Sequence, residues 1–128
     1  MASAISTFEA PAALGPYSQA TLLPPGARLL YVSGQIPLLP DGTLTSATIG
    51  EETAVCLSNA AAILRQAGTT LGNVIKATVF LTDMNDFAAV NAEYERWFPG
   101  TVKPARSCVE VRALPKGARV EVEVVAFV

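Results

Sequence analysis

The 128-residue sequence contains no histidine. Without imidazole, the Ser-His and Cys-His arrangements of nucleophilic enzymes cannot form, and zinc sites lose their usual ligand. The two cysteines, Cys56 and Cys108, are far apart and form no CxxC motif, which indicates free thiols in a reducing compartment. We therefore expect no metal site and no cofactor, and any chemistry of this chain must proceed without imidazole.

Charge and long apolar runs are also scarce. Charged residues make up 16% of the chain, hydrophobic residues make up 51%, and the net charge is −2. No basic cluster marks a nucleic-acid surface, and no apolar run reaches the 18 or so residues of a membrane helix. Such an apolar balance in a small chain predicts that copies of the chain cover part of its surface.

The N-terminal residues carry neither the basic region of a secretory signal nor the arginines of a transit peptide. We therefore expect a cytoplasmic protein; a mitochondrial location stays open, although no transit peptide is visible. The length fits a single domain over residues 1–128, with residues 1–9 loosely ordered or forming an edge segment.

Local patterns predict the order β-β-α-β-α-β-β, an α+β fold with two helices on one face of a mixed sheet. A capping box at Thr48-x-x-Glu51 starts the first helix, Gly68 ends it, and Ala54, Leu57, Ala61 and Leu64 form its buried stripe, leaving Cys56 off that stripe. The second helix follows residues 83–86 and stops before Pro99-Gly100, with an apolar face of Phe87, Val90, Tyr94 and Trp97. Strands are predicted at 29–33, 74–81, from about 105, and at 120–124.

The stretch from Lys103 to Val111 holds the most informative side chain, Arg106. Strand alternation places Arg106, Cys108 and Glu110 on one face. Val109 and Val111 lie on the other, which we expect to face the core. A guanidinium on a rigid strand matches a carboxylate with two parallel hydrogen bonds. From this stretch alone, the pattern favours the alternative, an ordinary ion-paired arginine.

Other candidates have structural alternatives. Tyr17, after the Gly15-Pro16 turn, either fills the core or lines a pocket. Ser33 and Gly34 end a strand, where they form a plain turn or expose backbone N–H groups to a ligand. Asn91 borders the apolar face of the second helix and serves either a structural bond or a site.

The last predicted strand alternates cleanly and places Glu121 and Glu123 on one face. The short connector before it predicts a hairpin with the Arg106 strand. One register of that hairpin sets Glu121 opposite Arg106, where the two side chains form either a cross-strand ion pair or part of a site.

Four separated motifs stand out in the chain: AALGPYSQ at 12–19, VSGQIP at 32–37, NDFAAVN at 85–91, and PARSCVEV at 104–111 followed by LPK at 114–116. Together they resemble the RidA (YjgF/YER057c/UK114) family. They occur in the family's order, and the resemblance spans the chain from about residue 10 to its end.

This resemblance implies a chorismate-mutase-like fold and a homotrimer with clefts between subunits. It implies hydrolysis of reactive 2-imino acids, such as 2-iminobutanoate and 2-iminopropanoate, to 2-oxo acids and ammonia. By motif position, Arg106 binds the substrate carboxylate, Glu121 positions water, Cys108 offers backbone contacts, and the pocket is lined by Tyr17, Ser33, Gly34 and Asn91. The alternative is a non-enzymatic binding, chaperone-like or translation-inhibiting protein of the same family.

Overall fold

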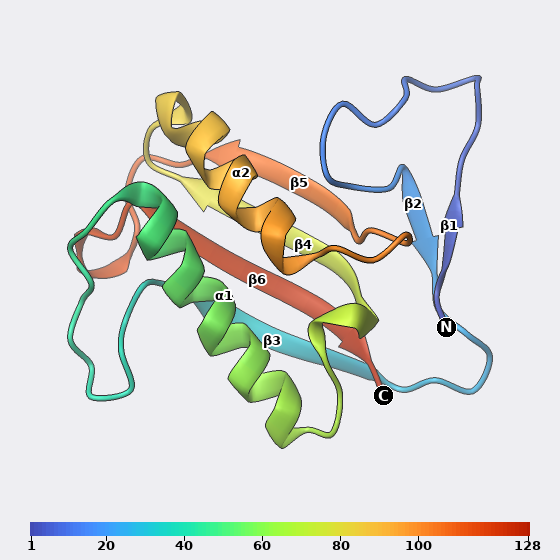
Figure 1. The fold of residues 1–128 in the computed structure, drawn as a ribbon, viewed down its shortest axis with the longest axis horizontal. Coiled ribbons are helices and arrows are strands. Elements are labelled where there is room, and N and C mark those ends of the chain that lie inside the picture. Colours follow the sequence, from blue (N-terminus) through green and yellow to red (C-terminus); the bar gives the residue numbers. More distant parts are fainter.

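A four-stranded mixed sheet with strand order β3-β6-β4-β5 forms the centre of the computed structural model, which describes residues 1–128 (Figure 1). Two helices lie on one face of this sheet, which confirms the predicted fold class. A small second sheet pairs β1 with β2 in antiparallel fashion. The strands are β1 Ser3–Ile5, β2 Ala20–Leu22, β3 Leu29–Gln35, β4 Val74–Leu81, β5 Ala105–Glu110 and β6 Val120–Phe127.

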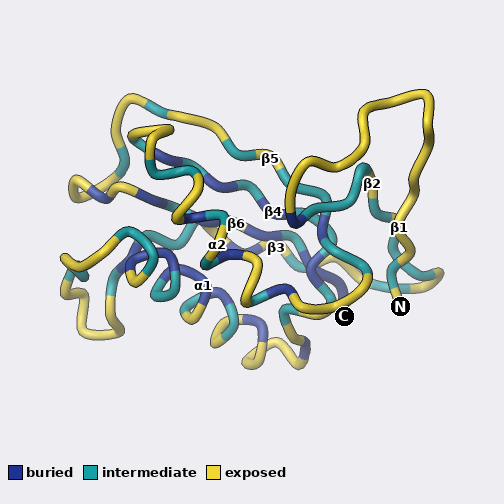
Figure 2. The backbone as a smooth tube through the Cα atoms, turned by 45° about the horizontal axis from the view of Figure 1, so that its top comes forward, coloured by how far each residue is buried: buried dark blue, intermediate teal, exposed yellow.

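Strand β6 occupies the middle of the sheet because its alternating sequence suits a strand with one covered face. Val120, Val122 and Val124 are fully or almost fully buried. β6 runs antiparallel to both β3 and β4, whereas β4 and β5 are parallel. Buried residues gather in β4, β6 and the helices (Figure 2).

Helix α1, Ile49–Gln66, begins where the capping box predicts, because the Thr48 side chain accepts a hydrogen bond from the Glu51 amide at 3.2 Å. The expected stripe is only partly right. The buried positions are Glu52, Thr53, Cys56, Leu57, Ala60 and Leu64, so Cys56 belongs to the core. The buried stripe is shifted from the predicted one because Cys56 and Ala60 pack into the core beside Leu57 and Leu64, whereas Ala54 and Ala61 are only partly buried.

Helix α2, Phe87–Trp97, follows a short 3₁₀ turn, η2 Met84–Asp86. The Asp83 side chain caps that turn by accepting a hydrogen bond from the Asn85 amide at 2.9 Å. Val90 and Tyr94 are buried, and Phe87 and Trp97 pack against the core, so the predicted apolar face is confirmed. Neither α1 nor α2 is long and apolar enough to cross a membrane.

The predicted hairpin between the last two strands is wrong. Among the strands, β5 pairs with β4 alone, while β6 enters between β3 and β4. Glu121 is therefore aligned with Phe80 and not with Arg106. The physical reason is burial: the valine-rich β6 gains more from a central position than β5, whose polar residues suit an edge.

Leu57 tests the packing of α1 on the sheet. Its side chain is fully buried, so Leu57→Ala should lower the free energy of unfolding by about 2–5 kcal/mol. The exposed neighbour Ser58 is the control, and Ser58→Ala should change stability by less than about 0.5 kcal/mol. Urea unfolding followed by circular dichroism measures both values, and equal losses would contradict this packing.

Candidate functional site

Arg106 points to the face of the sheet that the helices cover. In register it pairs with Ala77, which is fully buried on that face. Cys108 follows on the same face and packs against the core, whereas Val109 is 41% exposed on the other. The expectation that Val109 faces the core is therefore wrong. Alternation correctly grouped the residues, but only the position of the helices decides which group is covered.

Three aromatic rings surround the Arg106 guanidinium. Its central carbon lies 4.8 Å from the ring centroid of Tyr94, 5.6 Å from that of Tyr17 and 5.8 Å from that of Phe87. The Oδ1 atom of Asn91 accepts a hydrogen bond from Nη1 at 2.7 Å. Ring faces attract a cation and the amide fixes the orientation of the planar fork, so the guanidinium is held in place before any ligand binds.

No carboxylate of the chain neutralises Arg106. The two ion pairs in the structure are Arg96–Glu93 and Arg119–Glu52. Arg106 is half-buried and its one side-chain hydrogen bond goes to the neutral amide of Asn91. The ordinary ion-pair interpretation therefore fails within one chain. The remaining guanidinium N–H groups are free to bind an anion.

The loop before β2 brings Tyr17 to this position. Ser18 fastens the loop to the start of β5: its amide donates to the Pro104 carbonyl at 3.1 Å, and its hydroxyl donates to the Lys103 carbonyl at 2.5 Å. The Tyr17 hydroxyl accepts a hydrogen bond from the Leu14 amide at 3.2 Å. Tyr17 thus lines the surroundings of Arg106 and does not fill the core.

Phe87 and Tyr94 are the members of this cluster that sequence reasoning did not assign to a site. Both were expected only to pack against the core. Their spacing contains the missing signal: Phe87, Asn91 and Tyr94 stand at i, i+4 and i+7, so they share one helix face. Once Asn91 is a candidate, its two aromatic neighbours on that face are candidates as well.

Cys108 lies on the same strand face as Arg106. Burial raises the pKa of its thiol, and the nearby Arg106 charge opposes this only in part. The thiol is therefore protonated at neutral pH, and no histidine is present to activate it. This side chain is suited to packing and not to nucleophilic attack.

The remaining predicted residues form a second group on the uncovered face. Glu121 extends from β6 on the side opposite to the helices, next to Gly34 of β3, which follows the exposed Ser33. Burial, and secondarily the charge of Glu123, raise the pKa of the Glu121 carboxyl. Because β4 lies between β5 and β6 and the two side chains point to opposite faces of the sheet, one chain does not bring Glu121 and Arg106 together.

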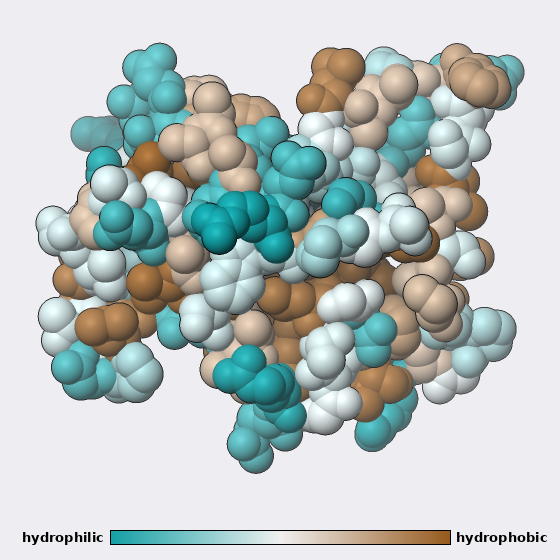
Figure 3. All heavy atoms as spheres, viewed as in Figure 1, coloured by the Kyte–Doolittle hydropathy of each residue, from teal (hydrophilic) through white to brown (hydrophobic).

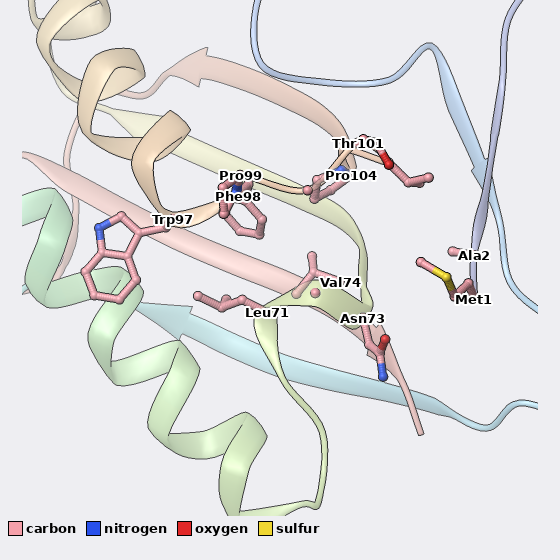
Figure 4. A pocket seen from close by; sticks show the side chains of 13 residues that line it. Met1, Ala2, Leu71, Asn73, Val74, Trp97, Phe98, Pro99, Thr101 and Pro104 are labelled. Carbon is pink, nitrogen blue, oxygen red and sulfur yellow. The ribbon is translucent and has the colours of Figure 1, made fainter.

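A cavity of about 360 Å³ lies elsewhere, between the N-terminal residues, the start of β4 and the connection from α2 to β5 (Figure 4). Trp97, Phe98, Leu71 and Val74 give it a mainly apolar lining. No charged side chain lines this cavity. It lacks a guanidinium or ammonium side chain that could clamp a carboxylate, so the Arg106 group remains the candidate site.

Comparison with known proteins agrees with the motifs. The sequence pattern of the family described as Endoribonuclease L-PSP matches residues 7–128. A crystal structure from Yersinia pestis, described as a protein of unknown function of the conserved Rid family, is 50% identical over the whole of both chains, with a TM-score of 0.76. The chain belongs to the RidA (YjgF) family.

Two curated members of the RidA family illustrate its range of names. A RutC family protein of Sinorhizobium fredii is 51% identical over 98% of this chain and 97% of its own length. A 2-iminobutanoate/2-iminopropanoate deaminase of Capra hircus is 49% identical over 95% of this chain and 87% of its own. The recognition of the family from the four motifs is thereby confirmed.

Alkylation tests the state of the two thiols. Because burial raises the pKa of Cys108 above its ordinary value and that of Cys56 to about 12, iodoacetamide should modify both thiols of the folded protein more slowly at pH 7.5 than it modifies the unfolded chain. The Cys108 rate should rise as the pH is raised, and Cys56 should react only after unfolding. Mass spectrometry of the two peptides gives each rate. Rapid modification of Cys108 at pH 7.5 would reveal a thiolate.

Proposed function

We propose that the protein hydrolyses 2-imino acids, such as 2-iminobutanoate and 2-iminopropanoate, to 2-oxo acids and ammonia. The observation that carries the proposal is Arg106: a half-buried, pre-oriented guanidinium with no carboxylate of its own chain. The substrate carboxylate supplies the missing partner. The relatives named as 2-iminobutanoate/2-iminopropanoate deaminases support the same chemistry.

The reaction needs little catalytic assistance from the protein. The C2 atom of an imine protonated on nitrogen is already electrophilic, so a positioned water attacks it. The amino group of the adduct then takes up the proton that the water lost, the C–N bond breaks, and ammonia leaves as the 2-oxo acid forms. Arg106 binds the carboxylate in two parallel hydrogen bonds and orients C2. Glu121 accepts a proton from the attacking water, a role for which a raised carboxyl pKa is favourable at neutral pH.

This mechanism requires two copies of the chain, because Arg106 and Glu121 lie on opposite faces of the sheet. In the proposed homotrimer, Arg106, Asn91, Tyr17 and Cys108 of one subunit face Ser33, Gly34 and Glu121 of the next. Apolar side chains on the face without helices support such an assembly: Tyr31 is 72% exposed, Leu29 48% and Val109 41%. On the face with helices, hydrophilic and hydrophobic residues are interspersed (Figure 3).

Reactive imines arise from pyridoxal-phosphate enzymes that act on serine and threonine, so the proposed role is metabolite damage control. A small cytoplasmic enzyme without cofactor fits this role, since the substrates also hydrolyse unaided and a moderate acceleration protects other enzymes. The proposal involves neither nucleic acid nor membrane.

Arg106→Lys tests the carboxylate clamp. Lysine keeps the charge but lacks the planar fork, so the transition state should lose about 2–4 kcal/mol of stabilisation. The kcat/KM for 2-iminobutanoate should then fall roughly 30- to 1000-fold. The assay follows 2-oxobutanoate formation by a threonine dehydratase while semicarbazide competes for the imine. The matched control, Arg112→Lys, changes an exposed arginine and should leave the rate unaltered.

A decarboxylated imine completes this test, because it offers Arg106 nothing to bind. The wild type should prefer the carboxylate substrate strongly, and Arg106→Lys should barely distinguish the two. Hydrolysis of 2-iminobutanoate by Arg106→Lys at the wild-type rate would eliminate the clamp.

Subunit mixing tests whether the site is shared. Arg106→Ala and Glu121→Ala should each be nearly inactive alone. When the two chains are co-expressed and assemble randomly into trimers, each mixed trimer regains one intact site, so about a quarter of the wild-type activity should return. Light scattering checks that the trimer forms. Mixed trimers without regained activity would place both residues in the site of a single chain.

A further inference from the structure

Gly34 lies at an irregularity in the pairing of β3 with β6. Val32 pairs with Val124, and the next pair is Gln35 with Val122, so β3 uses one residue more than β6 across this step. This extra residue is the signature of a β-bulge, which bends a strand and re-aims neighbouring side chains. The bulge lies directly beside Glu121.

The backbone of Gly34 does not explain why the residue is glycine. The glycines with positive φ angles are Gly26, Gly42, Gly68 and Gly117, and Gly34 is not among them. Its conformation is therefore one that residues with a side chain adopt readily. The reason for glycine must be space.

That space is filled by the Glu121 side chain. A Cβ atom at position 34 would lie 2.6 Å from Oε1 of Glu121, 2.7 Å from Cδ and 3.1 Å from Cγ. Real Cβ atoms essentially never approach another heavy atom within 3.0 Å. Any side chain at residue 34 and the present position of the Glu121 carboxylate therefore exclude each other.

Nothing else in the chain holds the carboxylate. Glu121 takes part in neither of the two ion pairs, and none of the side-chain hydrogen bonds ends on it. Its position depends on packing against β3. We propose that Gly34 is a positioning residue. Its missing side chain leaves a notch at the bulge, and this notch holds the Glu121 carboxylate where it can accept a proton from the attacking water.

This role goes beyond lining a pocket or offering an N–H group. It rests on the proposed function in one respect, that Glu121 accepts a proton from the attacking water. A general base acts only at the correct distance from its proton. Ordinary contact with a Cβ begins at 3.4 Å, and Oε1 of Glu121 lies 2.6 Å from the Cβ position of residue 34. In Gly34→Ala this oxygen must therefore move away by at least about 0.8 Å (3.4 − 2.6). Displacements on the order of 1 Å reduce rates up to 100-fold.

The kinetic test is a double-mutant cycle between residues 34 and 121. Gly34→Ala alone should lower kcat by roughly tenfold or more while KM changes little, since the substrate is held by Arg106. In the Glu121→Ala background the notch is empty, so adding Gly34→Ala should cost no further activity. An equal loss in both backgrounds would show that the new methyl group obstructs the substrate, and it would overturn the proposal.

Gly50→Ala is the matched control, because a Cβ at Gly50 meets nothing within 4 Å and the residue has no positive φ. This variant makes the same chemical change in helix α1 and should keep wild-type kcat and KM. A loss of activity here similar to that of Gly34→Ala would remove the specific role of position 34.

Crystal structures provide a readout that does not depend on the reaction. In Gly34→Ala the Glu121 carboxylate should leave its wild-type position, while β3 and β6 keep their register. If the carboxylate stays in place and the strands move apart instead, the notch is refuted even for an active enzyme. If the wild type hydrolyses no imine but the carboxylate moves as expected, the proposed function fails and the steric role stands.

Discussion

The structure depends on one constraint: both helices pack on the same face of the sheet. This packing decides which of the alternating side chains in each strand are buried and which face away from the helices. In β6 it buries Val120, Val122 and Val124 and turns Glu121 to the uncovered side. In β5 it draws Arg106 under α2. The two charged candidates are thereby separated by the thickness of the sheet, and the separation follows from strand geometry alone.

Keeping Arg106 charged beneath a helix requires compensation for lost water. Three aromatic faces supply part of it, at about 0.5–2 kcal/mol each, and the Asn91 amide supplies a hydrogen bond. None of these groups carries a negative charge. The guanidinium is thus ordered but not neutralised, an arrangement that favours binding of an external anion over a purely structural ion pair.

Local features of the fold could be predicted from the sequence, because short-range chemistry determines them. The cap at Thr48, the apolar face of α2 and strand β4 all followed from patterns within a few residues. The errors concern non-local choices. Alternation cannot reveal which strand face the helices cover, and this is why the sequence wrongly predicts that Val109 faces the core. Neither can it reveal strand order, and this is why the sequence wrongly predicts that Glu121 is aligned with Arg106. The aromatic surroundings of Arg106 depend on both choices.

The division of the candidate residues between two faces also fits the chemistry proposed for them. An imine that carries a carboxylate needs an anchor at one end and a base near its other end, and both must stay in fixed positions. Two strands of one rigid sheet, β5 and β6, provide such positions, one on each face, and under this proposal a neighbouring copy brings them to the same ligand. Assembly would then do more than cover apolar surface. It would create the proposed active combination from parts that the single chain keeps apart.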